Sequence, residues 1–389
     1  MALAYVTPYG VGLGHASRMT LVAEQLRDSG CEVRFSSFGE AADYVKRHGF
    51  VCETVPPVEF SWSMEGGFSI KHSLSKIPSW FLNFARQFGR ETSTIVSYSP
   101  DVVLSDSRLS PILAASFLNV PSLVVLNQIK LLLSPRLRDF AIARFFEQMV
   151  GEFLGLMWDR AGRILVPDLP PPYTISAHNL WGIDASRSRL EYVGFTSRRP
   201  SVTLEQMHKV ASMLLFDPAK PIVFVHISGP KGTREPLVRL AMEASRMLPE
   251  TQIVISGGLA RGSVEPSRLG HNGWYYEWCP IRDELFAMAS LIVMRGGHTA
   301  LSQAIQFGKP VVTIPIENHG EQLGNAEKIS ELGAGIMLSP KRLTAAELKA
   351  AIQKGIEGPS FKQRALEMMD RAESLDGTKN IADIVKTYL

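Results

Sequence analysis

Cysteine is scarce in this sequence, and the few residues present form no metal or disulfide pattern. Cys31, Cys52 and Cys279 are the only three among 389 residues, and none belongs to a CxxC pair or a Cys/His cluster. A disulfide framework and a structural metal site are therefore not indicated. We expect a protein of the reducing cytoplasm, where free thiols are the rule.

Long apolar runs are also missing. No stretch approaches the ~20 consecutive apolar residues of a membrane-spanning helix. The chain enters a strand at once, Ala2–Thr7, without a basic and apolar signal region. We therefore expect a soluble protein, or one that at most lies on the inner face of a membrane.

Charge of one sign is not in large excess. The 41 Lys and Arg residues against 38 Asp and Glu residues give a formal net charge of +3. This balance suits an anionic substrate or a membrane surface, but it is too weak to indicate nucleic-acid binding. The length of 389 residues suits two domains, each with a sizeable core.

Residues 290–335 carry the most informative pattern. The apolar run Leu291–Met294 ends in Arg295-Gly296-Gly297, and apolar residues then recur at helical spacing up to a Gly-Lys-Pro stop. A second buried strand, Val311–Ile316, precedes a polar loop and another helix. This order predicts an open parallel α/β sheet.

The glycine turn in this stretch favours an anion site. A helix N-terminus presents unpaired N–H groups, and glycines let a phosphate or diphosphate approach closely. A turn that needs glycine only for its dihedral angles explains the glycines equally well. The loop after the second strand favours a ligand, because its carboxylates and amides suit sugar hydroxyls at the carboxyl edge of the sheet: Glu317, Asn318, His319, Glu321, Gln322 and Asn325.

The stretch RGGHTALSQAIQFGKPVVTIPIENHGEQLGNA resembles the donor-binding region of GT-B glycosyltransferases. It is most similar to the glucosaminyltransferase of peptidoglycan synthesis (glycosyltransferase family 28-like) and its archaeal relatives. It is more distantly similar to the UDP-glucuronosyl and plant UDP-glycosyltransferases. The resemblance implies two Rossmann-like parallel-sheet domains facing a cleft, a nucleotide diphosphate sugar as donor, expected to be a UDP-sugar, and no cofactor.

The resemblance also implies donor contacts in the C-terminal half. In the family, a small-residue loop lies beside the diphosphate, and a short strand holds the uracil through backbone groups. Gln303 stands where many relatives carry a Glu that binds the ribose hydroxyls, so a charge-assisted hydrogen bond is lost. The expected donor-binding residues are Gly14, Ser228, Gly229, Cys279, Arg295, Gly296, Gly297, His298, Thr299, Gln303, Glu321 and Gln322.

The N-terminal half opens with its own strand, glycine loop and helix. The loop holds Gly10, Gly12 and Gly14 but lacks the GxGxxG spacing with an acidic residue on the next strand, so a dinucleotide cofactor is not indicated. His15 lies at the start of the helix, where the dipole disfavours the protonated ring. A lone histidine of this kind is more often structural than catalytic.

The motif GxGHxxR around His15 resembles that of archaeal GT-B transferases and of UDP-sugar hydrolases, in which the matching histidine is the general base. Asp106 ends the strand Pro100–Asp106 and matches an Asp that orients the histidine in plant transferases. A helix N-cap role explains Asp106 equally well. Arg18, Asn127 and Gln128 are expected on the acceptor side.

Two further segments are expected on the acceptor side. Phe60–Phe84 is aromatic without clear periodicity and is predicted to form a loop and a helix. Ser134–Arg163 has apolar residues at helical spacing and flanking arginines. It is either a helix that contacts a lipid-linked acceptor or anionic headgroups, or a core helix with a solvated basic edge, which we favour.

The sequence contains no Asp-x-Asp motif, the carboxylate pair that holds a divalent cation against the diphosphate in metal-dependent transferases. We therefore expect no metal. Helix ends and basic side chains would then balance the charge of the leaving diphosphate.

We expect an acceptor-side domain at 1–196 and a donor-binding domain at 197–370. The resemblance implies that a helix at 371–389 packs back on the first domain. The expected activity is inverting sugar transfer to an acceptor hydroxyl, with His15 as the base. A nucleotide-sugar hydrolase and a non-catalytic nucleotide-sugar-binding subunit are the alternatives.

Overall fold

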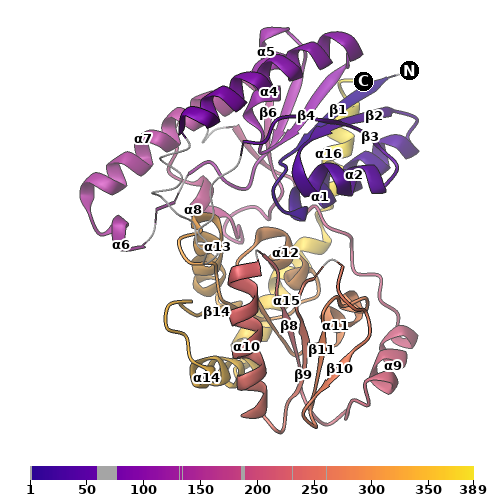
Figure 1. Ribbon diagram of the computed structural model, residues 1–389, viewed down its shortest axis with the longest axis vertical. Helices are drawn as coiled ribbons and strands as arrows, with labels where there is room; N and C mark the ends of the chain where they lie inside the picture. Colours follow the sequence, from indigo (N-terminus) through magenta and orange to yellow (C-terminus); the bar gives the residue numbers. More distant parts are fainter. Residues whose placement is uncertain are drawn as a thin grey trace. The chain divides into compact units, whose positions relative to one another are not determined.

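The computed structural model describes residues 2–58, 77–130, 132–133, 135–184, 189–229, 231–259 and 261–389. Most of the predicted loop at 60–84 lies outside these residues. The described chain divides into two compact units. Unit 1 contains the described residues up to Ser197 together with Ser374–Leu389, and unit 2 contains Arg198–Glu373 (Figure 1).

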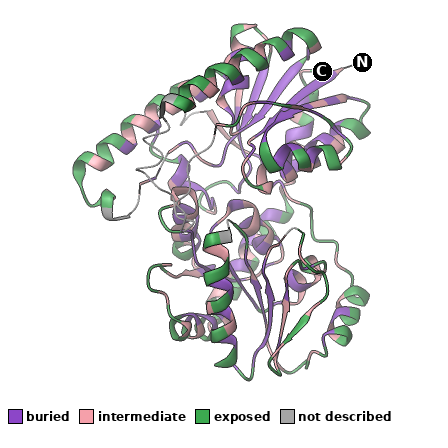
Figure 2. Ribbon diagram, viewed as in Figure 1, coloured by how far each residue is buried: buried purple, intermediate pink, exposed green. Residues whose placement is uncertain are grey.

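Unit 1 is built on a parallel sheet of seven strands in the order β3-β2-β1-β4-β5-β6-β7. The strands are β1 (Leu3–Pro8), β2 (Glu32–Ser37), β3 (Val51–Thr54), β4 (Val102–Asp106), β5 (Ser122–Val125), β6 (Arg163–Val166) and β7 (Leu190–Tyr192). The central strands are buried (Figure 2), as both faces of a parallel sheet require. The strand order reverses between β1 and β4, and open α/β sheets usually bind ligands at the carboxyl ends of the strands at such a reversal.

The helices of unit 1 cover this sheet. They are α1 (Leu13–Asp28), α2 (Gly39–Arg47), α4 (Ile77–Tyr98), α5 (Leu109–Phe117), α6 (Pro135–Arg138), α7 (Ala141–Trp158), α8 (Ala177–Leu180) and α16 (Gly377–Lys386). Ile381, Ala382 and Val385 of α16 are buried in one core with Met19 and Leu26 of α1. The C-terminal helix therefore completes the core of unit 1.

Unit 2 has a second seven-stranded sheet, in the order β10-β11-β9-β8-β12-β13-β14. Its strands are β8 (Ile222–His226), β9 (Gln252–Ser256), β10 (Ser267–Leu269), β11 (Gly273–Tyr276), β12 (Leu291–Met294), β13 (Val311–Thr313) and β14 (Gly335–Met337), of which β10 alone pairs antiparallel. Its helices are α9 (Leu204–Met213), α10 (Lys231–Arg246), α11 (Arg282–Met288), α12 (His298–Gln306), α13 (Gly320–Glu331), α14 (Ala345–Glu357) and α15 (Pro359–Glu373). The order reverses between β8 and β12.

The structure confirms the predicted order of elements at 290–335. Strand β13 ends at Thr313 and not at Ile316, because the chain then leaves the sheet and the Ile316 N–H donates to Gln322 Oε1 at 3.0 Å. The expectation of one core helix over 134–163 is wrong: the segment forms α6 and α7, and most of the large apolar side chains of α7 are exposed.

No helix of the described residues combines the length and the apolar character needed to cross a bilayer.

Candidate functional site

His15 lies in the first turn of α1, on the carboxyl edge of the unit 1 sheet. Gly12 precedes the helix with a φ of 73°, a left-handed conformation that favours glycine. Gly10 is buried against Phe38, and an added Cβ would lie 2.2 Å from that ring. The loop therefore depends on its small residues to bring α1 and His15 to the end of β1.

Asp106 meets His15 from the neighbouring strand. It is the last residue of β4 and pairs in register with Pro8 of β1. The His15 Nδ1 and Asp106 Oδ1 atoms are 2.8 Å apart, and the Asp106 side chain is fully buried whereas His15 is 22% exposed. The predicted pair is thus in direct contact, with the histidine on the open side.

Arg18, one turn further along α1, is the second partner of Asp106. It is buried, its Nε and Nη2 each lie 2.5 Å from an Asp106 oxygen, and Nη2 also donates to Asn127 Oδ1 at 3.2 Å. The expected acceptor contact of Arg18 therefore needs correction, because its guanidinium holds Asp106. Gln128 is partly exposed, and its Nε2 donates to the Lys130 carbonyl at 2.8 Å.

These partners keep Asp106 ionised. Burial alone would raise the pKa of this carboxyl group, but the charges of Arg18 and His15 and their hydrogen bonds outweigh it. The pKa of Asp106 therefore lies well below its ordinary value. An ionised carboxylate can only accept hydrogen bonds, so the Nδ1 of His15 carries a hydrogen, and in the neutral imidazole Nε2 is then the acceptor nitrogen.

Tyr9 is a neighbour of His15 that the sequence analysis did not single out. Its ring meets the imidazole edge-on, with centroids 5.7 Å apart, and it meets Phe38 in the same way at 5.5 Å. The Tyr9 hydroxyl donates to the Val58 carbonyl at 3.1 Å. Its place inside the glycine loop, two residues before Val11, was the only signal in the sequence.

In unit 2, Arg295 joins the loop after β12 to the end of β13 and to the first turn of α10, at the carboxyl edge of the sheet. It follows β12, and its Nη1 and Nη2 donate to the carbonyls of Ile314, at 3.0 Å, and Thr233, at 2.6 Å. The side chain is 5% exposed and its Nε has no hydrogen-bond partner among the described residues. Burial lowers the pKa of Arg295 to about 10, which leaves the guanidinium charged at neutral pH.

Gly296 lets the loop after β12 approach α13 closely. A Cβ at this position would lie 2.2 Å from the Gln322 carbonyl oxygen, so only glycine fits. Asn325 Nδ2 donates to the Gly296 carbonyl at 3.0 Å. The glycine turn and the polar loop predicted to bind donor are therefore held against each other.

The N-terminus of α12 has no side-chain cap among the described residues. Gly297 is its N-cap, and the first turn contains His298 and Thr299. His298 is buried, and Ser302 Oγ donates to its carbonyl at 2.9 Å. A helix N-terminus beside a buried cation suits an anion.

The remaining predicted donor residues also lie along this edge. Ser228 and Gly229 follow β8 and are exposed, and Gly229 has a φ of 108°. Glu321 and Gln322 lie in the first turn of α13 and are partly exposed. Gly14, by contrast, belongs to unit 1, in the first turn of α1.

Cys279 lies in the loop between β11 and α11. It is buried, and burial raises the pKa of its thiol to about 12, so the thiol is not a nucleophile at neutral pH. Among the described residues, none pairs with its backbone N–H or C=O. These two groups can therefore hydrogen-bond a ligand.

Gln303 lies in α12 and contacts a residue that the sequence analysis did not select. Its Nε2 donates to Asp283 Oδ1 of α11 at 2.9 Å. In the sequence, the only signal for Asp283 was its position in the first turn of a predicted helix that follows a strand of the sheet. Spacing along the chain does not reveal that the two helices touch there.

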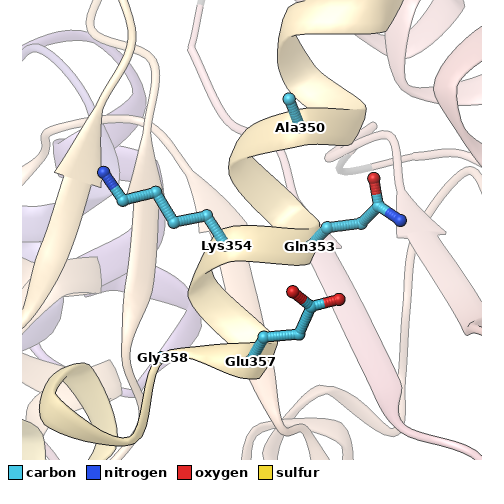
Figure 3. Close-up of a pocket in the computed structure, with 5 residues that line it drawn as sticks. All are labelled: Ala350, Gln353, Lys354, Glu357 and Gly358. Carbon is cyan, nitrogen blue, oxygen red and sulfur yellow. The ribbon is translucent and has the colours of Figure 1, made fainter.

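A separate depression lies at the opposite, amino edge of the unit 2 sheet. It measures about 470 Å³ and opens along α14 beside Ala350, Gln353, Lys354, Glu357 and Gly358 (Figure 3). Gly355 packs against Leu291, the first residue of β12, so this end of α14 is at the amino edge of the strands. The depression is therefore remote from the glycine loops.

Among the described residues, no three His, Cys, Asp or Glu side chains cluster as metal ligands would.

Residues 233–387 match the family model of the glycosyltransferase family 28 C-terminal domain. Proteins of Methanosarcina mazei and Methanosarcina acetivorans, both described as uncharacterized glycosyltransferases, are 26% identical over 382 residues, which cover 97% of this chain and 96% of each relative. The UDP-N-acetylglucosamine--N-acetylmuramyl-(pentapeptide) pyrophosphoryl-undecaprenol N-acetylglucosamine transferase of Geobacillus kaustophilus is 28% identical over 180 residues, covering 45% of this chain and 48% of that protein.

Solved glycosyltransferases share the fold over the whole chain. The calicheamicin glycosyltransferase CalG4 has a TM-score of 0.69 and 18% identity, with 100% of this chain and 98% of that chain covered. The spinosyn rhamnosyltransferase SpnG complexed with thymidine diphosphate has a TM-score of 0.67 and 17% identity, with 100% and 99% covered. The chain therefore has the GT-B fold of these glycosyltransferases, and its residues 233–387 match the C-terminal domain of glycosyltransferase family 28.

Proposed function

We propose that this chain is an inverting, metal-independent glycosyltransferase that moves a sugar from a UDP-sugar to an acceptor hydroxyl. The contact of His15 with Asp106 carries the proposal. It supplies an imidazole with Nδ1 held by a buried carboxylate at 2.8 Å, on the carboxyl edge of the unit 1 sheet. Such an imidazole is a suitable general base.

In the proposed reaction, Nε2 of His15 takes the proton of the acceptor hydroxyl. The acceptor oxygen forms a bond to the anomeric carbon while the bond from that carbon to the diphosphate oxygen breaks, with inversion. Asp106 stabilises the imidazolium that results, and Arg18 holds Asp106 in place. The leaving group departs as a nucleoside diphosphate.

Unit 2 would hold the donor. The N-terminus of α12 and the buried charge of Arg295 would stabilise the negative charge of the diphosphate without a metal. The free backbone groups of Cys279 suit the edge of a pyrimidine base. Glu321 and Gln322 at the start of α13 suit the hydroxyls of the transferred sugar.

The relatives support a nucleotide diphosphate donor. The Geobacillus protein is named for UDP-N-acetylglucosamine, and the solved SpnG complex contains thymidine diphosphate. Each unit also has a glycine loop that leads into a helix, α1 in unit 1 and α12 in unit 2. Two such loops suit a transferase, which must bind both a donor and an acceptor.

For the acceptor, we propose a lipid-linked molecule at the inner, cytoplasmic face of a membrane. The exposed face of α7 presents Ile142, Phe145, Phe146, Met149, Phe153 and Leu156 to solvent. Arg144 is exposed on the same helix. An apolar face with a cation suits the boundary between acyl chains and anionic headgroups, and the Geobacillus relative acts on an undecaprenol-linked acceptor by its name.

The test combines a donor panel with one variant. Purified protein is incubated with UDP-, GDP- and dTDP-sugars and membrane-extracted lipid acceptors, with and without EDTA. We expect transfer from a UDP-sugar that EDTA does not abolish. Replacing His15→Ala should lower kcat on the order of 10²- to 10⁴-fold, while UDP affinity measured by calorimetry stays unchanged.

His208→Ala, an exposed histidine of α9 in unit 2, is the matched control and should retain activity. Rapid release of free sugar without acceptor would show a hydrolase instead. Full turnover by the His15→Ala variant would overturn the mechanism.

A further inference from the structure

Tyr9 contacts both members of the candidate catalytic pair. It follows β1 directly, and its backbone N–H donates to the Asp106 carbonyl at 3.0 Å. Its ring meets the His15 imidazole edge-on, with centroids 5.7 Å apart and 79° between the ring planes. Edge-on pairs at this separation attract each other. The position of Tyr9 is therefore coupled to that of the imidazole.

The Tyr9 ring is itself held by packing. It meets the buried ring of Phe38 edge-on, with centroids 5.5 Å apart. Phe38 also lies against Gly10, where an added Cβ would be 2.2 Å from its ring. Because rings in a close-packed interior have little room to turn aside, Phe38 limits the positions open to the Tyr9 ring, and Tyr9 in turn limits those open to His15.

The Tyr9 hydroxyl fixes the far end of the ring. It donates to the Val58 carbonyl at 3.1 Å. The two preceding carbonyls are held in the same way from α4: Asn83 Nδ2 donates to that of Pro57 at 3.0 Å, and Gln87 Nε2 donates to that of Pro56. The segment 56–58 is thus anchored at three successive carbonyls, and it offers the hydroxyl a fixed acceptor.

His15 needs such a support because its hydrogen bonds hold only one atom of the ring. Among the described residues, its polar contacts are with Asp106 Oδ1 at 2.8 Å and Arg18 Nη2 at 3.0 Å, and both involve Nδ1. The side chain is 22% exposed, so the imidazole can still tilt about this atom. A contact to another part of the ring is required to fix the direction in which Nε2 points.

We propose that Tyr9 is a positioning residue for His15. Its ring holds the imidazole in the orientation that keeps Nδ1 on Asp106 and leaves Nε2 open to an acceptor hydroxyl, and its hydroxyl anchors that ring to the segment 56–58. This rests on the proposed role of His15 as the base. The aromatic ring is the part that His15 contacts, so a phenylalanine at this position should largely replace the tyrosine.

The test compares Tyr9→Phe with Tyr9→Leu in the full chain. Nuclear magnetic resonance of protein with isotope-labelled histidine follows the ring nitrogens of His15, whose signals are identified by their loss in His15→Ala. In the unmodified protein and in Tyr9→Phe, the signals should report one hydrogen-bearing nitrogen, Nδ1. In Tyr9→Leu they should move towards the average of the two tautomers, because the hydrogen bond that selects the tautomer is no longer held in place.

Transfer is measured alongside with the donor panel. Tyr9→Leu should lower kcat about twofold to tenfold, the size that the loss of one edge-on aromatic pair implies, while UDP affinity by calorimetry stays unchanged. Tyr9→Phe should keep kcat close to that of the unmodified protein. Tyr9→Met takes the place of Tyr9→Leu if the latter fails to fold.

Tyr44→Leu is the matched control, because Tyr44 of α2 also contacts a histidine ring, that of His48, with centroids 4.2 Å apart. It should change neither the His15 signals nor kcat. The positioning role is overturned if Tyr9→Leu leaves the His15 signals in place, or if Tyr9→Phe and Tyr9→Leu lower kcat equally. If His15→Ala itself keeps full turnover, the proposed function of His15 fails instead.

Discussion

Asp106 is a single buried carboxylate shared by two nitrogen groups. It contacts His15 Nδ1 and both donor atoms of the Arg18 fork, and no part of it reaches solvent. The arginine balances the carboxylate charge permanently, because its guanidinium does not titrate in the working range. Asp106 therefore holds the imidazole in one orientation without requiring it to be protonated.

The replacement Asp106→Asn should affect both roles of this carboxylate, the charge balance of Arg18 and the orientation of His15. The amide keeps the shape but leaves Arg18 buried without a counter-charge, so we expect a loss of about 3–5 kcal/mol in unfolding free energy. The wrong imidazole tautomer becomes accessible, and kcat should fall on the order of 10²-fold or more. Chemical denaturation and single-turnover transfer measure the two effects.

Asp43→Asn, an exposed carboxylate of α2, is the control and should change neither quantity. A stable Asp106→Asn variant with full turnover would contradict both roles.

The sequence was sufficient to predict that His15 and Asp106 lie close together, because each ends or follows a strand of a parallel sheet and such ends converge. It was not sufficient for Arg18. Whether an arginine three residues after His15 faces solvent or a carboxylate depends on β4, which is 84 residues away in the chain. Asp283 was missed for the same reason, since its partner Gln303 belongs to another helix.

Helix α7 is amphipathic with its apolar side outward. Its buried residues are Glu147, Gly151, Gly155 and Trp158. A Cβ at Gly151 would lie 2.5 Å from Ile183 Cδ1, so the small residues allow close packing on unit 1. Periodicity predicted the helix correctly but not the buried face, because the pattern of apolar residues alone does not distinguish core from interface.

We expect this outward face to bind anionic lipid vesicles. Phe145 and Phe153 are 69% and 60% exposed, and burying a phenylalanine is worth about 1.5–3 kcal/mol. The double variant Phe145→Ser/Phe153→Ser should lower vesicle partitioning at least about tenfold. Co-sedimentation with phosphatidylglycerol vesicles measures this.

The control is Leu204→Ser, which removes a 71% exposed apolar side chain from α9 of unit 2. Equal vesicle binding by the double variant and this control would contradict the membrane proposal.

The glycine turn, α12 and α13 were more predictable from the sequence than α7, since glycine and proline mark the ends of these elements unambiguously.

The two units share a parallel-sheet plan, as the sequence predicted, but they differ in their buried titratable groups. Unit 1 contains Asp106, whose pKa is depressed, so its contribution is present above the unfolded pKa of about 3.9 and is lost only as pH falls further. Unit 2 contains His226, a partly buried residue with a buried Nδ1, whose lowered pKa keeps it neutral. Below pH ~6.5 the unfolded chain binds a proton at this histidine that the folded unit does not.

His226 should therefore make unit 2 acid-labile. Its contribution falls by at most about 1.4 kcal/mol for each pH unit below the unfolded pKa, until the folded pKa of about 3 is reached. His226→Phe, which fits the ring cluster with Phe224 and Phe286, should flatten this dependence. Unfolding free energies from pH 7.5 to 4.5 measure it, and parallel curves for variant and unmodified protein would contradict it.

Unit 1 is made of two separate segments of the chain, which pack closely against each other where the first ends and the second begins. A Cβ on Gly377 would lie 2.1 Å from the Gly194 carbonyl oxygen, and Asn380 Nδ2 donates to the Val193 carbonyl at 2.8 Å. During synthesis, unit 2 has all of its residues as soon as Glu373 emerges from the ribosome. The earlier-made unit 1 still waits for α16 to seal its interior. The portion translated first is thus the one that matures last, and it is the one exposed to chaperones and proteases for longest.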